Sequence, residues 1–337
     1  MSPTSVRWGM LSTAGIGRLV ATALRRSESA SLVAVASRDA ARARAYADDV
    51  GIGSSFGSYE ELLAAEEVDA VYVALPVSMH TEWTRRALEA GKHVLCEKPF
   101  TLDPREAARC FDAAEAADRL CIEGLMWRLH PRTTLASRIV ADGAIGQLAT
   151  VRAALTVSVP PGDIRRSVAL GPGALGDLGC YCVSAIRLFA GEPERVHAEQ
   201  VLDGDDGVDL RMAATLAMPG GVLGVLDVGL DLTRRDELEL IGTAGKLTIP
   251  DPWICRQGYV ELERDGQVER LAVDPTGTVL TDPEHDAYRI EFEAASAAIA
   301  GTGKPRFGRV DAVAQATVLD ALRRAAQDVQ PVSLTSR

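Results

Sequence analysis

The chain has 337 residues, a length that favours two domains over one. Hydrophobic residues make up 47% of it and charged residues 25%, which is typical of a globular protein and not of a disordered one. The formal net charge of −11 argues against nucleic-acid and anionic-membrane partners, because their phosphate groups repel an acidic surface.

The first residues of the chain and the spacing of its cysteines indicate the cellular compartment that we expect for the protein. No signal peptide is recognisable, since a strand pattern begins at Val6, and no apolar run is long enough to span a bilayer. The six cysteines have the spacing of neither a zinc ribbon nor a disulfide framework. We therefore expect a cytoplasmic protein with buried free thiols, and no metal site, because no cluster has metal-ligand spacing.

The N-terminal part of the chain alternates strand and helix patterns. Amphipathic segments lie between short apolar runs, and Ser58 with Glu61 has the spacing of a helix capping box. The apolar runs predict buried parallel strands at Val6–Leu11, Leu32–Ala36, Ala70–Leu75, His93–Cys96 and Leu120–Glu123. This alternation predicts an α/β domain of the Rossmann type over residues 1–123, with a doubly wound sheet that binds a dinucleotide.

The pattern changes near residue 147, where an alternating run from Leu148 to Val159 leads to a glycine-rich helix, Ala174 to Ala190. Further strands are predicted at Val196–Leu202, Leu210–Met218, Val222–Leu230, Glu237–Ile241 and Lys246–Ile249, and helices at Tyr288–Ile299 and Val310–Ala326. Residues 124–337 should therefore form an α+β domain with an open, mostly antiparallel sheet. We expect it to bind substrate and mediate oligomerisation, with its C-terminal helix packing back on the Rossmann domain.

An open sheet covered by helices on one face must bury its other face elsewhere. Leu223, Val225 and Val228 suggest an apolar outer surface, which a partner subunit would cover. We therefore expect a homodimer or homotetramer.

The first predicted strand leads into a turn and then a helix, as in dinucleotide-binding folds. In the G-x-G-x-x-G fingerprint, backbone N–H groups approach a pyrophosphate and the helix N-terminus favours its charge. Here Ser12 and Ala14 stand at the first two glycine positions and Gly17 at the third. The expected cofactor contacts of this turn are Ser12, Thr13, Ala14, Gly15 and Ile16.

The end of the second strand indicates which dinucleotide is bound. NAD-specific sites place a carboxylate there for the ribose 2′-hydroxyl, whereas this chain has Ser37 followed by Arg38. A guanidinium suits a 2′-phosphate and can lie against adenine. The pair predicts NADP(H) in preference to NAD(H), with Asp39 as the cap of the following helix.

Lys98 lies at the end of a predicted parallel strand, the edge where open α/β sheets bind ligands, and Pro99 follows it. Here the sequence resembles the Gfo/Idh/MocA oxidoreductase family, whose Glu-Lys-Pro hallmark matches Glu97-Lys98-Pro99. The resemblance extends over nearly the whole chain. It includes the Ser37-Arg38 corner, the stretch from Pro76 to His80, Met126-Trp127-Arg128, and the stretch from Gly173 to Tyr181.

The resemblance implies that Lys98 faces both the nicotinamide and the reacting hydroxyl. Asp177 and Tyr181 are four residues apart on the glycine-rich helix, so they should share a face. Many family members have histidine at the second position. Tyrosine is found in glucose–fructose oxidoreductase and in its nearer relatives, among them dihydrodiol and xylose dehydrogenases and sugar 3-ketoreductases.

Hydride loss from a carbinol needs a base for the hydroxyl proton, and the reverse reaction needs an acid at the carbonyl oxygen. We assign Tyr181 as the proton donor or acceptor, Lys98 as its electrostatic partner and Asp177 as the acceptor of a substrate hydroxyl. The opposite division between Lys98 and Tyr181 stays open, since coupled groups share their titration. We interpret the glycines at 173, 176 and 179 as a close approach to the cofactor or a substrate ring.

Several other residues are candidates by position. Further cofactor contacts are expected from Leu75, Pro76, His80, Glu97 and Arg128, and substrate contacts from Trp127 and Arg165. His130 and Trp253 are expected to be structural.

Together these observations predict an NADP(H)-dependent oxidoreductase that transfers a hydride between the nicotinamide and a carbinol or carbonyl carbon of a sugar, polyol or dihydrodiol. The alternative is an NDP-sugar 3-ketoreductase of deoxysugar biosynthesis. A dinucleotide-dependent glycosidase and a non-catalytic regulator share the scaffold. The intact Glu97-Lys98-Pro99 motif argues against the glycosidase, and Lys98, Asp177 and Tyr181 together argue against the regulator.

Overall fold

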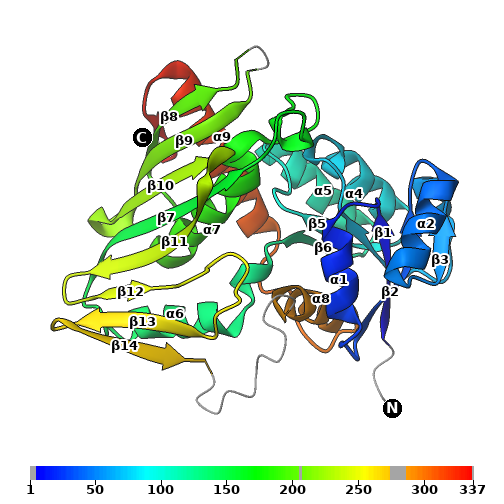
Figure 1. Cartoon of the computed structure of the whole chain (residues 1–337), viewed down its shortest axis with the longest axis horizontal. Coiled ribbons are helices and arrows are strands. Elements are labelled where there is room, and N and C mark those ends of the chain that lie inside the picture. Colours follow the sequence, from blue (N-terminus) through cyan, green and yellow to red (C-terminus); the bar gives the residue numbers. More distant parts are fainter. Residues whose placement is uncertain (1–4, 205–206, 274–285, 336–337) are drawn as a thin grey trace. The chain divides into compact units, whose positions relative to one another are not determined.

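A computed structural model describes residues 5–204, 207–273 and 286–335 (Figure 1). They form two compact units. The first unit contains the described residues 5–101, 105–126 and 286–313, and the second contains 102–104, 127–204, 207–273 and 314–335. This division differs from a single boundary at residue 123, because the chain returns to the first unit at 286–313.

The first unit is built on a six-stranded sheet in the order β3-β2-β1-β4-β5-β6, in which every neighbouring pair is parallel. The strands are β1 (Val6–Leu11), β2 (Ala30–Ala36), β3 (Ser54–Phe56), β4 (Ala70–Val73), β5 (His93–Glu97) and β6 (Cys121–Gly124). The strand order reverses between β1 and β4, which is where doubly wound sheets open a crevice at their carboxyl ends. The predicted Rossmann-type fold is confirmed.

The helices of this unit begin where the sequence provides caps. Asp39 accepts a hydrogen bond from Arg42 N at 3.0 Å, and Ser58 accepts one from Glu61 N at 3.1 Å. The Glu61 carboxylate accepts from Gly57 N at 3.0 Å, one residue before the position of an ideal capping box. The helices are α1 (Ile16–Leu24), α2 (Ala40–Val50), α3 (Tyr59–Ala64), the 3₁₀ turn η1 (Val77–Met79), α4 (His80–Glu89), α5 (Pro104–Ala116) and α8 (Asp286–Ile299).

Helix α8 joins the first unit from far along the chain. It packs against α1, and its Phe292 ring lies edge-on to Trp8 and Tyr72, with centroids 4.9 and 5.2 Å apart. Trp8 Nε1 donates to Ser296 on the same helix at 3.1 Å. All three aromatic rings are buried, so α8 completes the core on this face of the sheet.

The second unit contains a nine-stranded sheet in the order β14-β13-β12-β11-β7-β10-β9-β8-β15. Its strands are β7 (Leu148–Ser158), β8 (Arg195–Leu202), β9 (Asp209–Ala217), β10 (Leu223–Gly229), β11 (Asp231–Gly242), β12 (Lys246–Thr248), β13 (Tyr259–Arg264), β14 (Gln267–Ala272) and β15 (Val332–Ser333). Among the strand pairs that the described residues form in this sheet, only β7–β10 is parallel, which confirms the predicted open, mostly antiparallel sheet.

Helix α7 (Cys180–Ala190) and the π-helical turn η4 (Leu175–Gly179) pack against β7 and β10. Gln315 on α9 (Arg309–Asp328) donates to the Cys180 carbonyl at 2.7 Å and accepts from the buried Arg187 at 2.8 Å. Residues 314–328 of α9 are therefore fixed to α7 within this unit. The remaining elements are η2 (Met126–Arg128), α6 (Pro131–Ala141), and the 3₁₀ turns η3 (Ile164–Arg166) and η5 (Pro219–Gly221).

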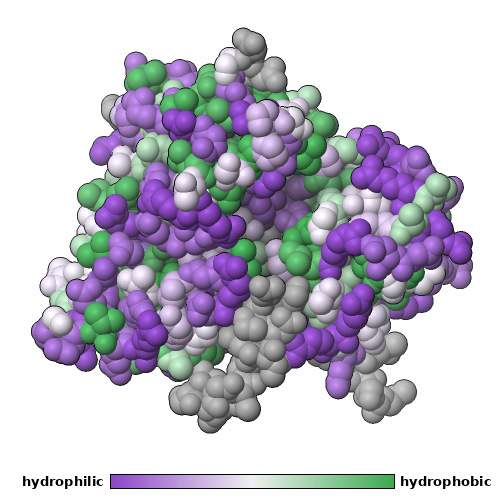
Figure 2. All heavy atoms as spheres, in the orientation of Figure 1, coloured by the Kyte–Doolittle hydropathy of each residue, from purple (hydrophilic) through white to green (hydrophobic). Residues whose placement is uncertain are grey.

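The outer face of this sheet is more polar than expected. Leu223 is exposed, but Val228 is 1% exposed and belongs to the inner face, so the predicted apolar stripe is wrong at that position. Val228 has the opposite parity to Leu223 and Val225, and alternate residues of a strand face opposite sides. Beside Val225, Asp227 forms an ion pair with Arg235, which also pairs with Glu237. Figure 2 shows hydrophobic residues of this unit in small separate groups among hydrophilic ones.

All six cysteines are buried free thiols, as expected. In the part of the chain that the structure describes, no helix is both long and apolar enough to cross a bilayer.

The end of β11 offers a test of the second unit's packing. A Cβ added at Gly242 would lie 2.1 Å from the Ile145 carbonyl oxygen, a backbone atom that cannot swing away. Gly242→Ala should lower the free energy of unfolding by about 1–3 kcal/mol, measured by urea denaturation. Gly53→Ala is the control, because its added Cβ would come no closer than 3.8 Å to any neighbour. Equal stabilities of the two variants would contradict this packing.

Candidate active site

The turn after β1 is held in an unusual conformation. Ser12 has a φ of 124°, which is strained for a residue with a side chain. Its hydroxyl donates to the Ala74 carbonyl at 2.6 Å and accepts from Ala14 N at 3.2 Å. These two bonds fix the turn in the conformation that a glycine usually provides at the first fingerprint position.

The rest of the turn fits a bound pyrophosphate. Gly15 is exposed, and a Cβ there would meet nothing within 4 Å, so space lies in front of the N-terminus of α1. A Cβ at Gly17 would lie 2.4 Å from Met10, which is the close helix–strand contact expected of the third fingerprint glycine. Tyr46 holds the turn from behind by donating to the Ala14 carbonyl at 2.9 Å. Thr13 and Ile16 lie in the same turn and are partly exposed.

A basic corner lies at the carboxyl end of β2. Arg38 is exposed, and both Arg38 and Arg42 lie near enough to the Tyr59 hydroxyl to lower its pKa. Burial has the larger effect on that phenol and raises its pKa overall. Ser37 is mostly buried and accepts from Asp39 N at 3.4 Å. Two guanidinium groups and a phenol in place of an acid form a donor set suited to a ribose 2′-phosphate.

His80 connects the loops that follow β4 and β5. It is 1% exposed, with Nε2 2.8 Å from the Leu75 carbonyl and Nδ1 2.9 Å from the Pro99 carbonyl. Burial lowers its pKa, which favours the neutral ring, and a neutral ring can donate to only one of the two carbonyls. His80 thus supports the backbone on either side of the candidate cofactor site, next to Leu75 and Pro76.

Lys98 follows the last residue of β5, and its peptide bond to Pro99 is cis. Its backbone N–H donates to Glu97 Oε2 at 3.2 Å, and Tyr72 donates its hydroxyl proton to Glu97 Oε1. Glu97 therefore lies between the core of the sheet and the backbone of Lys98. The first unit brings together the predicted set at Ser12–Ile16, Leu75, Pro76, His80, Glu97 and Lys98, on the loops after three neighbouring strands.

In the second unit, Asp177 lies in the π-helical turn η4 and Tyr181 in the first turn of α7. The sequence predicted one regular helix from Ala174 to Ala190, whereas the structure divides it at Cys180. Turns of the π type occur often at functional sites. Both side chains are largely buried, with the Asp177 side chain 14% exposed and Tyr181 8% exposed.

Arg165 points at Asp177. Its Nη1 lies 3.8 Å from Asp177 Oδ2, while its Nε and Nη2 donate to Asp163 at 2.9 and 2.8 Å. The hydrogen bonds from Arg165 lower the pKa of Asp163, and the Asp163 carboxylate in turn holds the guanidinium in one orientation. The predicted substrate residues Arg165 and Asp177 are thus neighbours in the structure.

Asp209, at the start of β9, caps the turn that carries Asp177. It accepts a 2.6 Å hydrogen bond from Leu175 N, and burial raises its pKa from 3.8 to about 6. A Cβ at Gly173, whose φ is 67°, would lie 1.8 Å from Asp209 Oδ1, and one at Gly176 would lie 2.3 Å from Pro172. Protein atoms therefore already crowd these two glycines, which corrects the interpretation that they make room for a ligand.

Trp253 supports Tyr181 from the side. Its ring centroid lies 5.8 Å from that of Tyr181 and 5.7 Å from that of Trp127, and its Nε1 donates to the Ala154 carbonyl at 3.1 Å. Trp127 and Trp253 are each 1% exposed, so both rings are part of the core beside Tyr181. Arg128 is also buried, and it belongs to the second unit.

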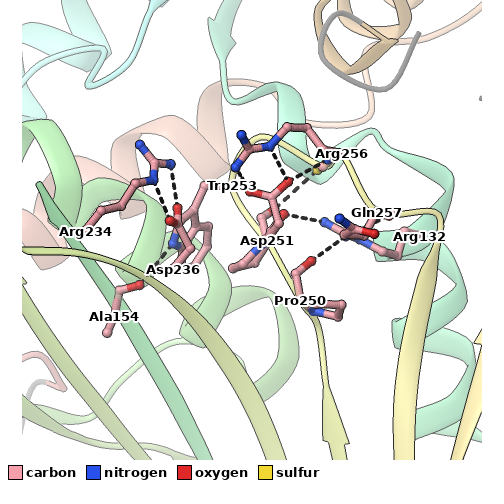
Figure 3. A network of polar contacts seen from close by, with 11 residues as sticks. Arg132, Ala154, Arg234, Asp236, Pro250, Asp251, Trp253, Arg256 and Gln257 are labelled. Carbon is pink, nitrogen blue, oxygen red and sulfur yellow. Dashed lines mark hydrogen bonds and ion pairs between the residues drawn. The ribbon is translucent and has the colours of Figure 1, made fainter.

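A buried arginine fixes the loop that carries Trp253 (Figure 3). Arg132 donates to the carbonyls of Pro250, Gln257 and Asp251 at 2.6, 2.8 and 2.9 Å. Asp251, with a φ of 47°, accepts from the backbone and guanidinium of Arg256. Loop 250–257 is thereby held in one conformation. The sequence marked Trp253 as structural and gave no role to Arg132, because each appears as an isolated residue in the sequence.

The comparisons with known proteins agree with this architecture. The family model described as the oxidoreductase family with an NAD-binding Rossmann fold, GFO_IDH_MocA, matches residues 6–125, and the GFO/IDH/MocA C-terminal domain matches residues 133–248. The chain belongs to the Gfo/Idh/MocA oxidoreductase family.

Similar members of this family carry different names. The chain is 37% identical to D-xylose 1-dehydrogenase (NADP(+)) 2 of Haloferax volcanii, over 97% of this chain and 99% of that protein. It is 33% identical to dTDP-3,4-didehydro-2,6-dideoxy-alpha-D-glucose 3-reductase of Actinomadura kijaniata, over 96% of each. The crystal structure of a 3-ketoreductase from Actinomadura kijaniata with NADP and TDP-benzene superimposes with a TM-score of 0.87 at 32% identity, covering 96% of this chain and 98% of that one.

The basic corner of this oxidoreductase gives a test of dinucleotide preference. Arg38→Ala should raise the Kd for NADPH at least about tenfold more than the Kd for NADH, because only NADPH carries the phosphate. Fluorescence titration with each dinucleotide measures this difference. Arg44→Ala is the matched control, since Arg44 lies on α2, the helix that follows Arg38, is strongly exposed and pairs with Asp48. Equal losses for both dinucleotides would contradict the assignment of Arg38 to the phosphate.

The buried Asp209 predicts a pH dependence of stability. The folded state binds this proton more tightly than the unfolded state, so Asp209 destabilises the fold increasingly as pH rises from about 4 to about 6. Asp209→Asn cannot ionise. The difference in free energy of unfolding, variant minus wild type, should therefore rise over that range and stay constant above it. Urea denaturation at half-unit pH steps measures the difference, and parallel curves for the two proteins would contradict this effect.

Proposed function

We propose that this chain is an NADP(H)-dependent oxidoreductase that interconverts a carbinol and a carbonyl on a sugar, polyol or dihydrodiol. The observation that carries the proposal is the helix of the second unit, where Tyr181 and Asp177 are largely buried and Arg165 is directed at Asp177. A phenol beside a paired acid can bind and protonate an oxygen-rich substrate. The same chain supplies a dinucleotide fold with Lys98 at the end of a central strand.

NADP(H) is preferred because of the donors at the end of β2. Arg38, Arg42 and Tyr59 replace the carboxylate that would bind a free 2′-hydroxyl. The names of the Haloferax dehydrogenase and of the Actinomadura structure both include NADP, which supports the same preference here.

The proposed chemistry divides the work among side chains of this chain. When bound, the dinucleotide supplies or accepts the hydride. Tyr181 transfers the proton at the substrate oxygen, and the Lys98 ammonium stabilises negative charge on that oxygen. Asp177 accepts a hydrogen bond from a neighbouring substrate hydroxyl, with Arg165 holding it in place. The opposite division between Lys98 and Tyr181 remains the alternative.

A second candidate function is reduction of a nucleotide-linked keto-sugar. It is favoured by the identity and the TM-score of 0.87 shared with the Actinomadura proteins, whose names describe 3-ketoreduction. The two candidates share a hydride step and differ in the group attached to the sugar. Cofactor contact by Arg128, substrate contact by Trp127, a cytoplasmic location and homo-oligomerisation stay predictions.

Two substitutions test the assigned roles. Lys98→Met should abolish turnover while leaving the Kd for NADPH nearly unchanged, because it removes the ammonium and keeps a side chain of similar length. Tyr181→Phe should lower kcat by about 10² or more, because it removes only the hydroxyl that transfers the proton. Steady-state kinetics and NADPH titration measure both effects. Wild-type kcat in either variant would remove that residue from the mechanism.

A substrate panel separates the two candidate functions. NADP+ reduction is followed by absorbance with D-xylose, D-glucose, inositol and a trans-dihydrodiol, and NADPH oxidation with a dTDP-linked 3-keto-sugar. The first candidate predicts a kcat/KM at least about tenfold higher for a free sugar or diol than for the nucleotide-linked sugar. The reverse order would establish the ketoreductase, and no hydride transfer with any class would contradict both.

A further inference from the structure

Tyr72 is a polar residue in the middle of an apolar strand. It lies on β4, is completely buried, and packs edge-on against Phe292 of α8 with centroids 5.2 Å apart. Burial raises the pKa of its phenol well above 10, so the hydroxyl keeps its proton and can act as a permanent donor. That donor is directed at Glu97 Oε1.

The register of the sheet explains why Tyr72 reaches Glu97. Tyr72 pairs with Leu95 on β5, so the side chain of Glu97, two residues further along, emerges on the same face. The other oxygen of Glu97 accepts the backbone N–H of Lys98 at 3.2 Å. One carboxylate thus links a buried phenol in the sheet to the backbone of the proposed cationic residue.

Two other acidic side chains, Glu291 and Glu123, lie in the surroundings of Glu97. Glu291 of α8 is 2% exposed, and its Oε1 has no hydrogen-bond partner among the described residues. Burial raises its pKa well above 4.5, and the nearby Glu97 and Glu123 raise it further, so Glu291 favours its protonated form. Glu123 accepts from Phe100 N at 3.0 Å. A fixed donor holds an acceptor that lies near other acids in one orientation, and the Tyr72 hydroxyl is such a donor.

We propose that Tyr72 is a positioning residue for the reaction, acting through Glu97 on the backbone of Lys98. This inference rests on the proposed role of Lys98. Removing the phenol oxygen would take this donor from the part-buried Glu97 Oε1, and the carboxylate would turn away from the Lys98 N–H. The ammonium at the end of that residue would then lose its alignment with the substrate oxygen, which slows the hydride step without weakening dinucleotide binding.

The first measurement is independent of turnover. The chain has only four lysines, so protein labelled with ¹⁵N-lysine gives four backbone amide signals, at positions 92, 98, 246 and 304. Lys98→Met assigns its signal by removing it. Tyr72→Phe should shift the Lys98 signal and leave those of Lys246 and Lys304 in place. An unchanged Lys98 signal would overturn the proposed link.

The second measurement uses the whole enzyme with its best substrate. Tyr72→Phe should lower kcat about tenfold or more, raise the primary isotope effect from 4-deuterated NADPH, and leave the Kd for NADPH within about twofold. Glu97→Gln should have the same effects on kcat, the isotope effect and the Kd. The double variant should be no slower than the slower single variant, because both residues act through the same contact with the Lys98 backbone. Glu291→Gln is the control, with wild-type kcat expected, since it keeps the size and neutrality of the protonated acid.

The outcomes separate this inference from the proposed function. A Tyr72→Phe variant with wild-type kcat, or with lower kcat and an unchanged isotope effect, overturns the positioning role, since a purely structural defect reduces only the active fraction. If Lys98→Met is fully active while the Lys98 amide still shifts in Tyr72→Phe, the assigned role of Lys98 fails and the structural link stands. If Lys98→Met is inactive and Tyr72→Phe is not impaired, only this inference fails.

Discussion

The first unit depends on hydrogen bonds that join the loops at the carboxyl ends of its central strands. Ser12, after β1, donates to Ala74 after β4, and His80 connects Leu75 with Pro99 after β5. A doubly wound sheet brings these three loops together at the reversal of strand order, but it does not fix their conformations. The side-chain bonds to backbone carbonyls do so, and they let strained residues such as Ser12 persist at a candidate cofactor site.

In the second unit, side-chain hydrogen bonds to backbone groups likewise fix a turn and a loop. Asp209 caps the turn that bears Asp177, and Arg132 binds three carbonyls of the loop that places Trp253 against Tyr181. Each of these buried polar groups costs desolvation free energy that its hydrogen bonds must offset. Burial raises the pKa of Asp209 for that reason. Such groups are retained where geometry matters more than stability, which fits two side chains proposed to act on a substrate.

The sequence predicted the elements that depend on local or periodic signals. The run Val6–Leu11 is β1, and the caps Asp39 and Ser58 are confirmed, because side-chain capping is decided within four residues. Strands β3, β13, β14 and β15 were missed. The short edge strand β3 and the exposed strand β14 show no apolar pattern of a buried strand. The parity of Val228 was also wrong, because a short apolar run does not say which face is buried.

The candidate site was predictable where residues lie together in sequence. Glu97-Lys98-Pro99 and the pair Asp177 and Tyr181 can be recognised as motifs in the sequence alone. Tyr72 and Asp209 cannot be recognised in this way, because each is a single polar residue within or beside an apolar run, and its partner lies 25 or 34 residues away. Only the register of a sheet or the packing of a turn brings such pairs together, and that information is tertiary.

The residues near the proposed cofactor site and those near the proposed substrate contact differ in how firmly they are held. This difference is consistent with relatives of one fold whose names describe different substrates. Residues next to the proposed cofactor site and to Lys98 are held by hydrogen bonds to backbone groups, as Glu97 and His80 are. The segment around Arg165 is different, since Ile164 and Val168 beside it are 51% and 63% exposed. Substitutions there cost little stability, because exposed side chains contribute little to the core. The segment of the proposed substrate contact Arg165 can therefore be substituted while the backbone around the proposed hydride-transfer residues keeps its conformation.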